Sequence, residues 1–222
     1  AGVSAWANWR NLIPKLSDRY RVLAPDLAGF GYTEIPDTFE FRFMATWIEQ
    51  LEALLDALGV TSAHWVGNSF GGALTLWMAA QRPDLCDRLV LMGPGGWPTK
   101  VNENLGALWG YKPSVDNMKR IMDIMAFDRA LVTDELAKLR YRATIRPGAQ
   151  ERFERIFPPP YQRWLDAQAL SIEALESIGI TSLHNLRVKF QHGHGTNNAD
   201  AIGLFRFAIE KRGREANANG TV

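Results

Sequence analysis

Residues 64–74 read His-Trp-Val-Gly-Asn-Ser-Phe-Gly-Gly-Ala-Leu, and this stretch decides the fold. Its first residues form a short apolar run that predicts a buried strand. The segment from Gly71 to Ala80 is apolar on nearly every face and precedes Pro83, which predicts a packed helix. The Gly-x-Ser-x-Gly pentapeptide 67–71 lies between them. In that setting a strained turn lifts the hydroxyl of Ser69 above the sheet, and the glycines remove β-carbons that would clash. Without strand and helix, the pentapeptide would be a chance match.

The flanking segments extend this pattern into an α/β fold. Residues 20–24, 63–66 and 88–92 have the composition of strands, and residues 43–58 place apolar side chains at helical spacing before Gly59, which suits a C′ position. Strands that alternate with helices predict right-handed crossovers and a parallel sheet. Ligands of such sheets collect at the carboxyl ends of the strands.

A helical block follows the third strand. One apolar stripe runs through residues 115–125, Thr133 is followed by two acids as an N-cap would be, and three prolines at 158–160 precede a last helix that carries Trp164, Leu165 and Leu170. We interpret residues 1–98 as the N-terminal part of the core, 99–178 as a helical lid, and 179–222 as a C-terminal core remnant with a frayed tail.

Two patterns belong to that last segment. Residues 186–191 alternate between apolar and polar side chains, which predicts a fourth strand that runs into His192. Ile202, Phe205 and Ile209 keep a helical spacing, and we expect no further strand after them.

Composition limits the classes of function. The 222 residues are 46% hydrophobic and carry 25 basic against 24 acidic side chains, so neither a nucleic-acid binder nor a polybasic membrane binder is expected. No apolar run of about 18 residues and no signal peptide is evident, which favours a cytoplasmic protein without a membrane partner. Cys86 is the single cysteine, so an internal disulfide is excluded. We expect a small, largely apolar partner and no cofactor or metal.

The chemistry that the pentapeptide predicts is nucleophilic. A serine hydroxyl attacks only when a base takes its proton, and the oxyanion that results needs fixed donors, usually two backbone amides. The amide of Phe70, at the start of the helix, supplies one donor. The second would come from a loop after an earlier strand, and the chain begins at Ala1 apparently inside that loop, so we expect a truncated N-terminus.

Four stretches carry a resemblance to a known family: residues 2–9 (Gly-Val-Ser-Ala-Trp-Ala-Asn-Trp), 22–31 (Val-Leu-Ala-Pro-Asp to Gly-Phe-Gly), 67–72 (Gly-Asn-Ser-Phe-Gly-Gly) and 139–142 (Leu-Arg-Tyr-Arg). Over residues 1–178 the sequence resembles the meta-cleavage product hydrolases, α/β-hydrolases that break a carbon–carbon bond in the ring-fission products of catechols. The resemblance implies an α/β-hydrolase fold with a helical lid, and a 2-hydroxy-6-oxo-2,4-dienoate as substrate.

The resemblance also implies roles for individual residues. Ser69 would be the nucleophile and Phe70 an oxyanion-hole donor, while Arg140 in the lid would hold the carboxylate or 2-oxo group of the substrate, because a guanidinium fork matches a carboxylate. Arg142 could exchange roles with Arg140. Asn8, Asn68 and Trp164 complete the predicted substrate-binding set. Each has a structural alternative: the asparagines as turn or cap residues, Arg140 as a solvated helix charge and Trp164 as a core aromatic.

The pattern departs from the family at the base. The family places its acid after a His-Gly pair and its histidine on a later loop, but here residues 192–196 read His-Gly-His-Gly-Thr and no histidine follows His194. Thr196 stands where the acid is expected. His192 or His194 could reach Ser69 and act as its base only by an unusual path of the chain. Asp200 could orient one of them only if the acid and the histidine occurred in reversed order along the sequence. The sequence stops resembling the family from about residue 179.

Three interpretations follow: a carbon–carbon bond hydrolase, a general carboxylesterase on the same fold that takes an ester substrate, or a catalytically impaired fragment that lacks the triad acid and histidine. A sheet without its edge strands also favours association into a homo-oligomer.

Overall fold

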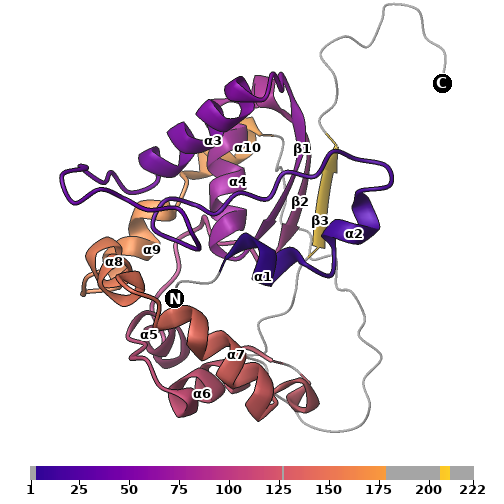
Figure 1. Ribbon diagram of the computed structural model, residues 1–222. Helices are drawn as coiled ribbons and strands as arrows, with labels where there is room; N and C mark the ends of the chain where they lie inside the picture. The colour runs from indigo at the N-terminus through magenta and orange to yellow at the C-terminus, as the bar shows by residue number, and fades with distance from the viewer. Residues whose placement is uncertain (1–3, 127, 179–205, 211–222) are drawn as a thin grey trace, which may run out of the picture. The chain divides into compact units, whose positions relative to one another are not determined.

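The computed structural model describes residues 4–126, 128–178 and 206–210, the last five by their backbone (Figure 1). Contacts within the chain divide it into two units. The first unit consists of Ala1–Gln50 and Thr99–Ala167, and the second of Leu51–Pro98 and Gln168–Val222. Helix α3 (Ala45–Ala57) begins in the first unit and ends in the second.

The sheet belongs to the second unit. Strand β1 (Ala63–Asn68) pairs parallel to β2 (Cys86–Met92), with His64 opposite Arg88 and Asn68 opposite Met92. Helix α4 (Phe70–Gln81) and the short 3-10 helix η1 (Pro83–Leu85) connect the two strands. The predicted strand–helix–strand crossover is therefore confirmed, as is the end of the helix before Pro83.

Strand β3 (Arg206–Glu210) pairs antiparallel to β2 on its other edge. The prediction of helical spacing around Ile209, with no further strand, is therefore wrong. Phe207 and Ile209 also recur at the period of a strand, and a segment this short fits both periods. The open edge of β2 supplies hydrogen-bond partners that a helix could not use. The fourth strand predicted at residues 186–191 lies outside the described residues.

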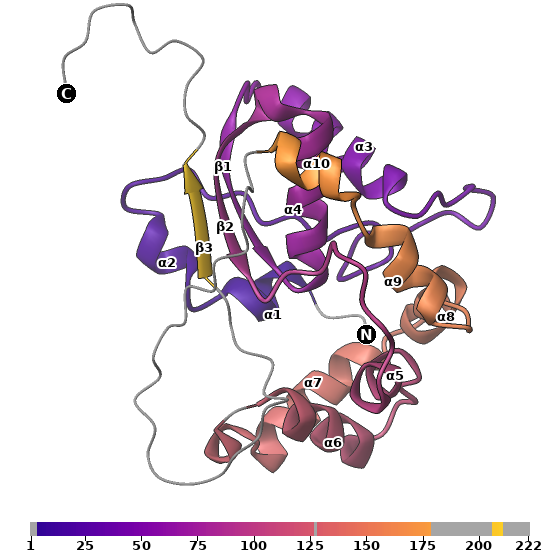
Figure 2. The same ribbon diagram turned by 180° about the vertical axis from the view of Figure 1, so that it is seen from behind.

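Helix α4 covers one face of the sheet, and α10 (Ile172–Ser177) lies beside it in both views (Figures 1 and 2). A core cluster joins these elements through Leu76 of α4, Leu91 of β2, and Leu170 and Leu175 of the segment around α10. The Trp77 indole donates to the carbonyl of Gln168 at 2.8 Å. Thus the nearly all-round apolar character of α4 is explained by burial between sheet and helix.

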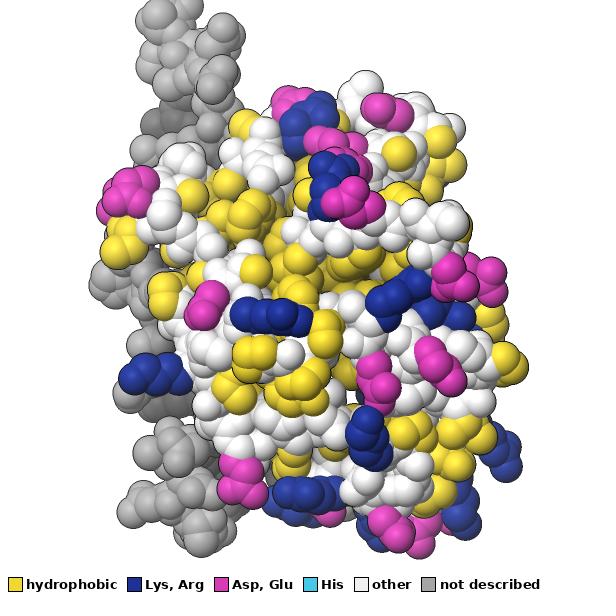
Figure 3. All heavy atoms as spheres, turned by 90° about the vertical axis from the view of Figure 1, so that its left-hand side faces the viewer, with side chains coloured by type: hydrophobic (Ala, Val, Ile, Leu, Met, Phe, Trp, Pro, Cys, Tyr) yellow, Lys and Arg dark blue, Asp and Glu magenta, His cyan; other side chains and the backbone are white. Residues whose placement is uncertain are grey.

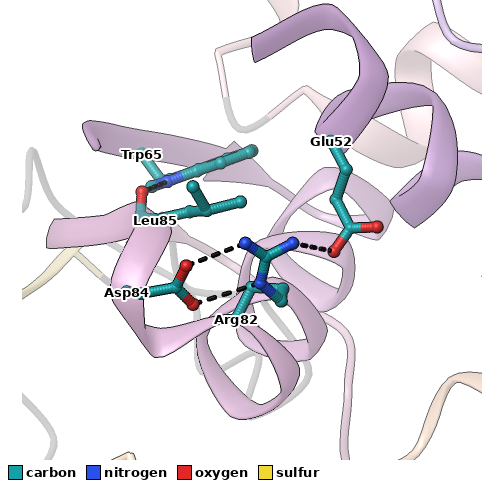
Figure 4. Close-up of polar contacts among 5 residues, drawn as sticks. All are labelled: Glu52, Trp65, Arg82, Asp84 and Leu85. Atoms are coloured by element: carbon teal, nitrogen blue, oxygen red, sulfur yellow. Dashed lines mark hydrogen bonds and ion pairs between the residues drawn. The ribbon is translucent and has the colours of Figure 1, made fainter. Parts of the chain in front are cut away.

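A polar junction fixes the turn from α4 into β2 (Figure 4). Arg82 donates to both carboxylate oxygens of Asp84, at 3.1 and 2.8 Å, and to Glu52 of α3 at 2.8 Å. Hydrogen bonds to these two carboxylates raise the pKa of the Arg82 guanidinium. The Trp65 indole of β1 donates to the carbonyl of Leu85 at 2.9 Å. Both sets of bonds hold the segment that sets the register of β2 against β1.

The first unit is helical. Besides the first part of α3 it contains α1 (Ala5–Trp9), α2 (Ile13–Leu16), α5 (Glu103–Trp109), α6 (Val115–Met125), η2 (Arg129–Leu131), α7 (Asp134–Thr144), α8 (Ala149–Ile156) and α9 (Gln162–Gln168). The apolar stripe over residues 115–125 is α6, and the Thr133 hydroxyl caps α7 by accepting from the amide of Leu136, as predicted. Helix α9 includes Trp164 and Leu165 but ends before Leu170.

Residues 20–24, predicted as a strand, have no regular structure. Tyr20 and Leu23 are exposed, and no strand among the described residues pairs with this segment. A strand exists only where a neighbour completes its hydrogen-bond ladder, so an apolar, β-branched sequence is not sufficient.

An aromatic cluster forms the core of the first unit around Trp47. Its ring is 0% exposed and lies with its centroid 4.8 Å from that of Phe41 and 5.3 Å from that of Phe43, both edge-on. Phe157, which follows α8, stacks against Trp47 at 6.2 Å. The Trp47 indole donates to the carbonyl of Ala28 at 2.9 Å, so its polar atom is satisfied inside the core.

Charge is mixed on the face drawn in Figure 3, where Lys and Arg side chains alternate with Asp and Glu around apolar patches. That face has no extended area of one sign, in agreement with the nearly balanced composition. In the described part of the chain, no helix is long and apolar enough to cross a membrane.

The aromatic cluster makes a first prediction. Replacing Trp47 with Ala should lower the free energy of unfolding by about 3–5 kcal/mol, because it removes a fully buried ring and leaves a cavity. Trp6→Ala is the matched control, since Trp6 is 62% exposed and its loss should change stability by about 0.5 kcal/mol or less. Urea denaturation monitored by circular dichroism measures both. Equal losses in the two variants would contradict the assignment of Trp47 to the core.

Candidate active site

Ser69 occupies a strained turn between β1 and α4. Its backbone angles are φ 53° and ψ −118°, and among the described residues only Met44 is another non-glycine with positive φ. Such a conformation costs on the order of 1–3 kcal/mol and persists only where the surroundings enforce it. Ser69 therefore lies where the sequence predicted it, at a sharp bend between a strand and a helix.

Backbone hydrogen bonds from the end of β2 hold this turn. The Ser69 amide donates to the carbonyl of Met92 at 3.0 Å, and the Ser69 carbonyl accepts from the amides of Gly72 and Gly95, both at 2.9 Å. Because both polar backbone groups of the residue are engaged, the turn cannot relax without breaking bonds to two other elements.

Two glycines make room for the turn, and a third does not. A β-carbon on Gly67 would lie 2.5 Å from the carbonyl oxygen of Gly71, and one on Gly72 would lie 2.5 Å from the Cβ of Pro94. A β-carbon on Gly71 would meet nothing within 4 Å. The expectation that the glycines of the pentapeptide avoid clashes is therefore correct for Gly67 and wrong for Gly71, while Gly72, just outside the pentapeptide, does have this role.

The setting of Ser69 suits a nucleophile. Ser69 and Asn68 are exposed, so the hydroxyl is open to reagents. Phe70 is the first residue of α4 and follows the serine directly, so its backbone amide belongs to the positive N-terminal end of the helix. This is the geometry in which an amide next to the serine can face an oxyanion.

Among the described residues, no histidine lies next to Ser69. His64, the one histidine of this part of the chain, is the second residue of β1 and lies roughly 16 Å along the strand from Ser69. Its Nδ1 is 3.8 Å from Oδ2 of Asp87 on β2. The candidates His192 and His194, like Thr196 and Asp200, lie outside the described residues, so their roles stay predictions.

The other predicted residues belong to the first unit. Asn8 is exposed on α1, and Arg140 is half-buried on α7, where its neighbours along the same stripe are the buried Ala137 and Thr144. Burial and the charge of Arg10 together lower the pKa of the Arg140 guanidinium. Arg142, the predicted substitute for Arg140, is exposed.

Trp164 is engaged inside its own unit. Its indole donates to the carbonyl of Pro158 at 2.8 Å, and its ring lies 4.8 Å from that of Phe43. The guanidinium of Arg163 covers the ring at 4.3 Å. These contacts favour the core interpretation of Trp164 over a substrate contact.

The sequence analysis missed the role of Asp26. Its carboxylate accepts from the amide of Ala5, the first residue of α1, at 2.5 Å and from the amide of Tyr32 at 2.8 Å. The signal was an aspartate directly before a glycine-rich loop, where a carboxylate commonly binds backbone amides. Among the described residues, no group of three or more His, Cys, Asp or Glu side chains is placed to hold a metal ion.

Comparison with known families agrees with this geometry. The family model for the alpha/beta hydrolase fold matches residues 1–183. The chain is an α/β hydrolase. The fold class predicted from the sequence is thereby confirmed for the hydrolase.

Two relatives of the hydrolase are named as hydrolases of related ring-fission products. Over 177 residues it is 50% identical to the 2-hydroxy-6-oxo-2,4-heptadienoate hydrolase of Pseudomonas putida strain F1, covering 80% of this chain and 64% of the relative. It is 48% identical to the 2-hydroxymuconate semialdehyde hydrolase of Pseudomonas sp. strain CF600, covering 80% and 62%. The hydrolase thus spans somewhat less than two thirds of the length of these relatives.

A solved structure extends the similarity. The meta-cleavage product hydrolase of Pseudomonas fluorescens IP01, solved as a serine-to-alanine mutant complexed with acetates, matches with a TM-score of 0.77 at 50% identity, covering 80% of the hydrolase and 65% of that chain. The predicted resemblance to this group of enzymes is confirmed as a similarity.

The glycines of the turn yield a second prediction. Gly67→Ala and Gly72→Ala should each destabilise the hydrolase by about 1–3 kcal/mol, because the added carbon meets atoms that cannot easily move. Gly71→Ala is the matched control, and it should be neutral or stabilising by up to about 1 kcal/mol, since alanine is the better helix former. Equilibrium denaturation measures all three. A Gly71→Ala variant as unstable as the other two would contradict this account of the turn.

Proposed function

We propose that the hydrolase cleaves the carbon–carbon bond of 2-hydroxy-6-oxo-2,4-dienoates, the ring-fission products of catechols, in a reaction that depends on Ser69. The observation that carries the proposal is the strained, hydrogen-bonded turn at Ser69, within a sequence about 50% identical to enzymes named for this substrate class. The roles of the other site residues around the substrate, including Arg140 and the base, are also part of this proposal.

The chemistry proceeds in two stages. The dienol first ketonises, which places a carbonyl at C2 as an electron sink. Water, directly or after attack by the Ser69 hydroxyl, then adds to the C6 carbonyl, and the bond between C5 and C6 breaks. The oxygen of water ends in the released carboxylic acid, and C5 takes up a proton. The amide of Phe70 would stabilise the oxyanion at C6.

Arg140 would bind the carboxylate end of the substrate. Its half-buried position on α7 supports this role, because a guanidinium that is partly removed from water gains more from an anion than an exposed one does. Asn8 and Asn68 would contribute polar contacts to the dienoate.

His192 and His194 are the candidates for the base that accepts the proton of Ser69. Loss of the base lowers turnover in serine hydrolases by factors on the order of 10⁴–10⁶. The rate at which this chain hydrolyses the dienoate therefore also tests whether one of the two histidines acts as the base. His192→Ala and His194→Ala variants identify which.

Turnover provides the third prediction. When the chain is added to 2-hydroxy-6-oxohepta-2,4-dienoate, the yellow dienolate absorbance should decline, and Ser69→Ala should abolish this decline. Ser17→Ala, which removes an exposed hydroxyl at the end of α2, should leave the rate unchanged.

Two outcomes would contradict the proposal. A decline that persists in Ser69→Ala would exclude the serine mechanism. Hydrolysis of p-nitrophenyl acetate without any loss of the dienolate would instead identify a general carboxylesterase on the same fold.

A further inference from the structure

The loop 26–33 of the first unit closes around the side chain of Asp26. Oδ2 of the carboxylate accepts from the amide of Tyr32 at 2.8 Å, and the Asp26 carbonyl accepts from the hydroxyl of Thr33 at 2.8 Å. Gly31 has a φ of 53°, and a β-carbon on it would lie 2.0 Å from Oδ2 of Asp26. The carboxylate therefore lies directly against the backbone of the loop, and only glycine fits at that contact.

Helix α3 fixes this loop within the unit. Gln50 donates from Nε2 to the Asp26 carbonyl at 3.0 Å and accepts at Oε1 from the amide of Ala28 at 2.8 Å. The fully buried Trp47 donates from its indole to the carbonyl of Ala28 at 2.9 Å. These bonds hold the backbone on which the carboxylate of Asp26 is mounted, so the carboxylate is a fixed point for the segments that bind to it.

The second oxygen of that carboxylate binds α1. Oδ1 of Asp26 accepts from the amide of Ala5, the first residue of the helix, where backbone amides have no acceptor inside the helix. No residue of α1 is buried, so packing contributes little to holding this helix in place. Asn8 lies on the same helix, and its amide donates to the carbonyl of Ser4 at 3.3 Å. The position of Asn8 in the unit therefore depends on the bond between Asp26 and Ala5.

The same loop also binds the end of α7. Arg146, two residues beyond that helix, donates to the carbonyl of Gly31 at 2.8 Å, and its guanidinium lies 4.4 Å over the ring of Tyr32. These are the two residues that close on the carboxylate from the other side. Arg140, the proposed partner of the substrate carboxylate, belongs to α7. One loop therefore joins α1 to the helix that carries Arg140.

We propose that Asp26 is a positioning residue for substrate binding, which acts through Ala5 to hold α1 where Asn8 contacts the dienoate. The inference rests on the proposed function and adds to it a residue that does not itself touch the substrate. A polar side chain displaced by about 1 Å loses most of its contribution, because a hydrogen bond weakens steeply with distance and angle. A carboxylate suits such an anchor, since a charged acceptor binds backbone amides more strongly than a neutral one does.

One substitution removes the anchor and spares the helix. Ala5→Pro deletes the amide that Asp26 binds, at the first position of α1, where proline is favoured. Ser4, directly before it, has φ −76° and ψ 159°, an extended conformation that a following proline accepts. Asp26→Asn is a second variant, because its side chain keeps the shape but turns a donor toward one of the two backbone N–H groups. Asp18→Asn is the matched control, the same change at an exposed position.

Affinity for the intact substrate measures the effect. Ser69→Ala provides a background in which the proposed reaction does not proceed, and calorimetric titration with 2-hydroxy-6-oxohepta-2,4-dienoate gives the dissociation constant. In that background Asn8→Ala, Ala5→Pro and Asp26→Asn should each weaken binding by roughly fivefold, which corresponds to the loss of one hydrogen bond. Combining Asn8→Ala with Ala5→Pro should weaken binding no further, because a displaced Asn8 has no contact left to lose. Asp18→Asn should leave the affinity unchanged.

Independent losses would overturn the inference. If the double variant binds more weakly by the product of the two single effects, about 25-fold, Asp26 does not act through Asn8. Far-UV circular dichroism and thermal melting verify that each variant is folded, and Ala5→Pro provides the test if Asp26→Asn does not fold. A lower melting temperature at unchanged affinity would leave Asp26 a purely structural role. An Asn8→Ala variant that binds as tightly as its background would also overturn the inference.

The inference and the proposed function fail in different ways. If the coupled losses of affinity are found but the chain with Ser69 intact hydrolyses no dienoate, the proposed reaction is wrong and the role of Asp26 stands. If Ser69-dependent hydrolysis is found and the two losses are independent, the reaction stands and the role of Asp26 is wrong. A background that binds no dienoate overturns the inference, while hydrolysis by the unsubstituted chain decides the proposed function separately.

Discussion

The strained backbone of Ser69 is the constraint on which the second unit depends. A residue with φ 53° and ψ −118° is unfavourable by itself, and it persists because its amide and carbonyl are bonded to the end of β2, to the loop after it and to α4. The same bonds fix where β1 stops, where α4 begins and how closely the loop after β2 must approach. Close packing at Gly67 and Gly72 follows from that approach, because no side chain fits where backbone meets backbone.

Local chemistry explains which parts of the fold could be predicted from the sequence. The crossover from β1 to β2 was predictable because an apolar strand, a glycine-containing turn and a helix follow one another within 30 residues. The helix at 115–125 and the Thr133 cap were predictable for the same reason. The segment at 20–24 was mispredicted because a strand depends on a partner elsewhere in the chain. Strand β3 was mispredicted because five residues fit both a strand and a helix.

The candidate site shows the same division. Ser69 was predictable because the strain that exposes it is encoded in adjacent residues. Asp26 was missed because its importance arises from contacts between segments. Asp26 joins the loop 26–33 to the amide of Ala5, 21 positions earlier in the chain. No spacing rule connects such residues, so only coordinates bring them together.

The position of the partners of Ser69 has a consequence for biosynthesis. Every backbone bond that holds its turn, including those to Met92 and Gly95, lies within residues 63–96. The entropic cost of closing so short a segment is smaller than that of joining strands far apart in the sequence. The backbone partners of the nucleophile are therefore all present once this segment has left the ribosome, whereas the core cluster that buries α4 forms only after Leu170 and Leu175 have followed.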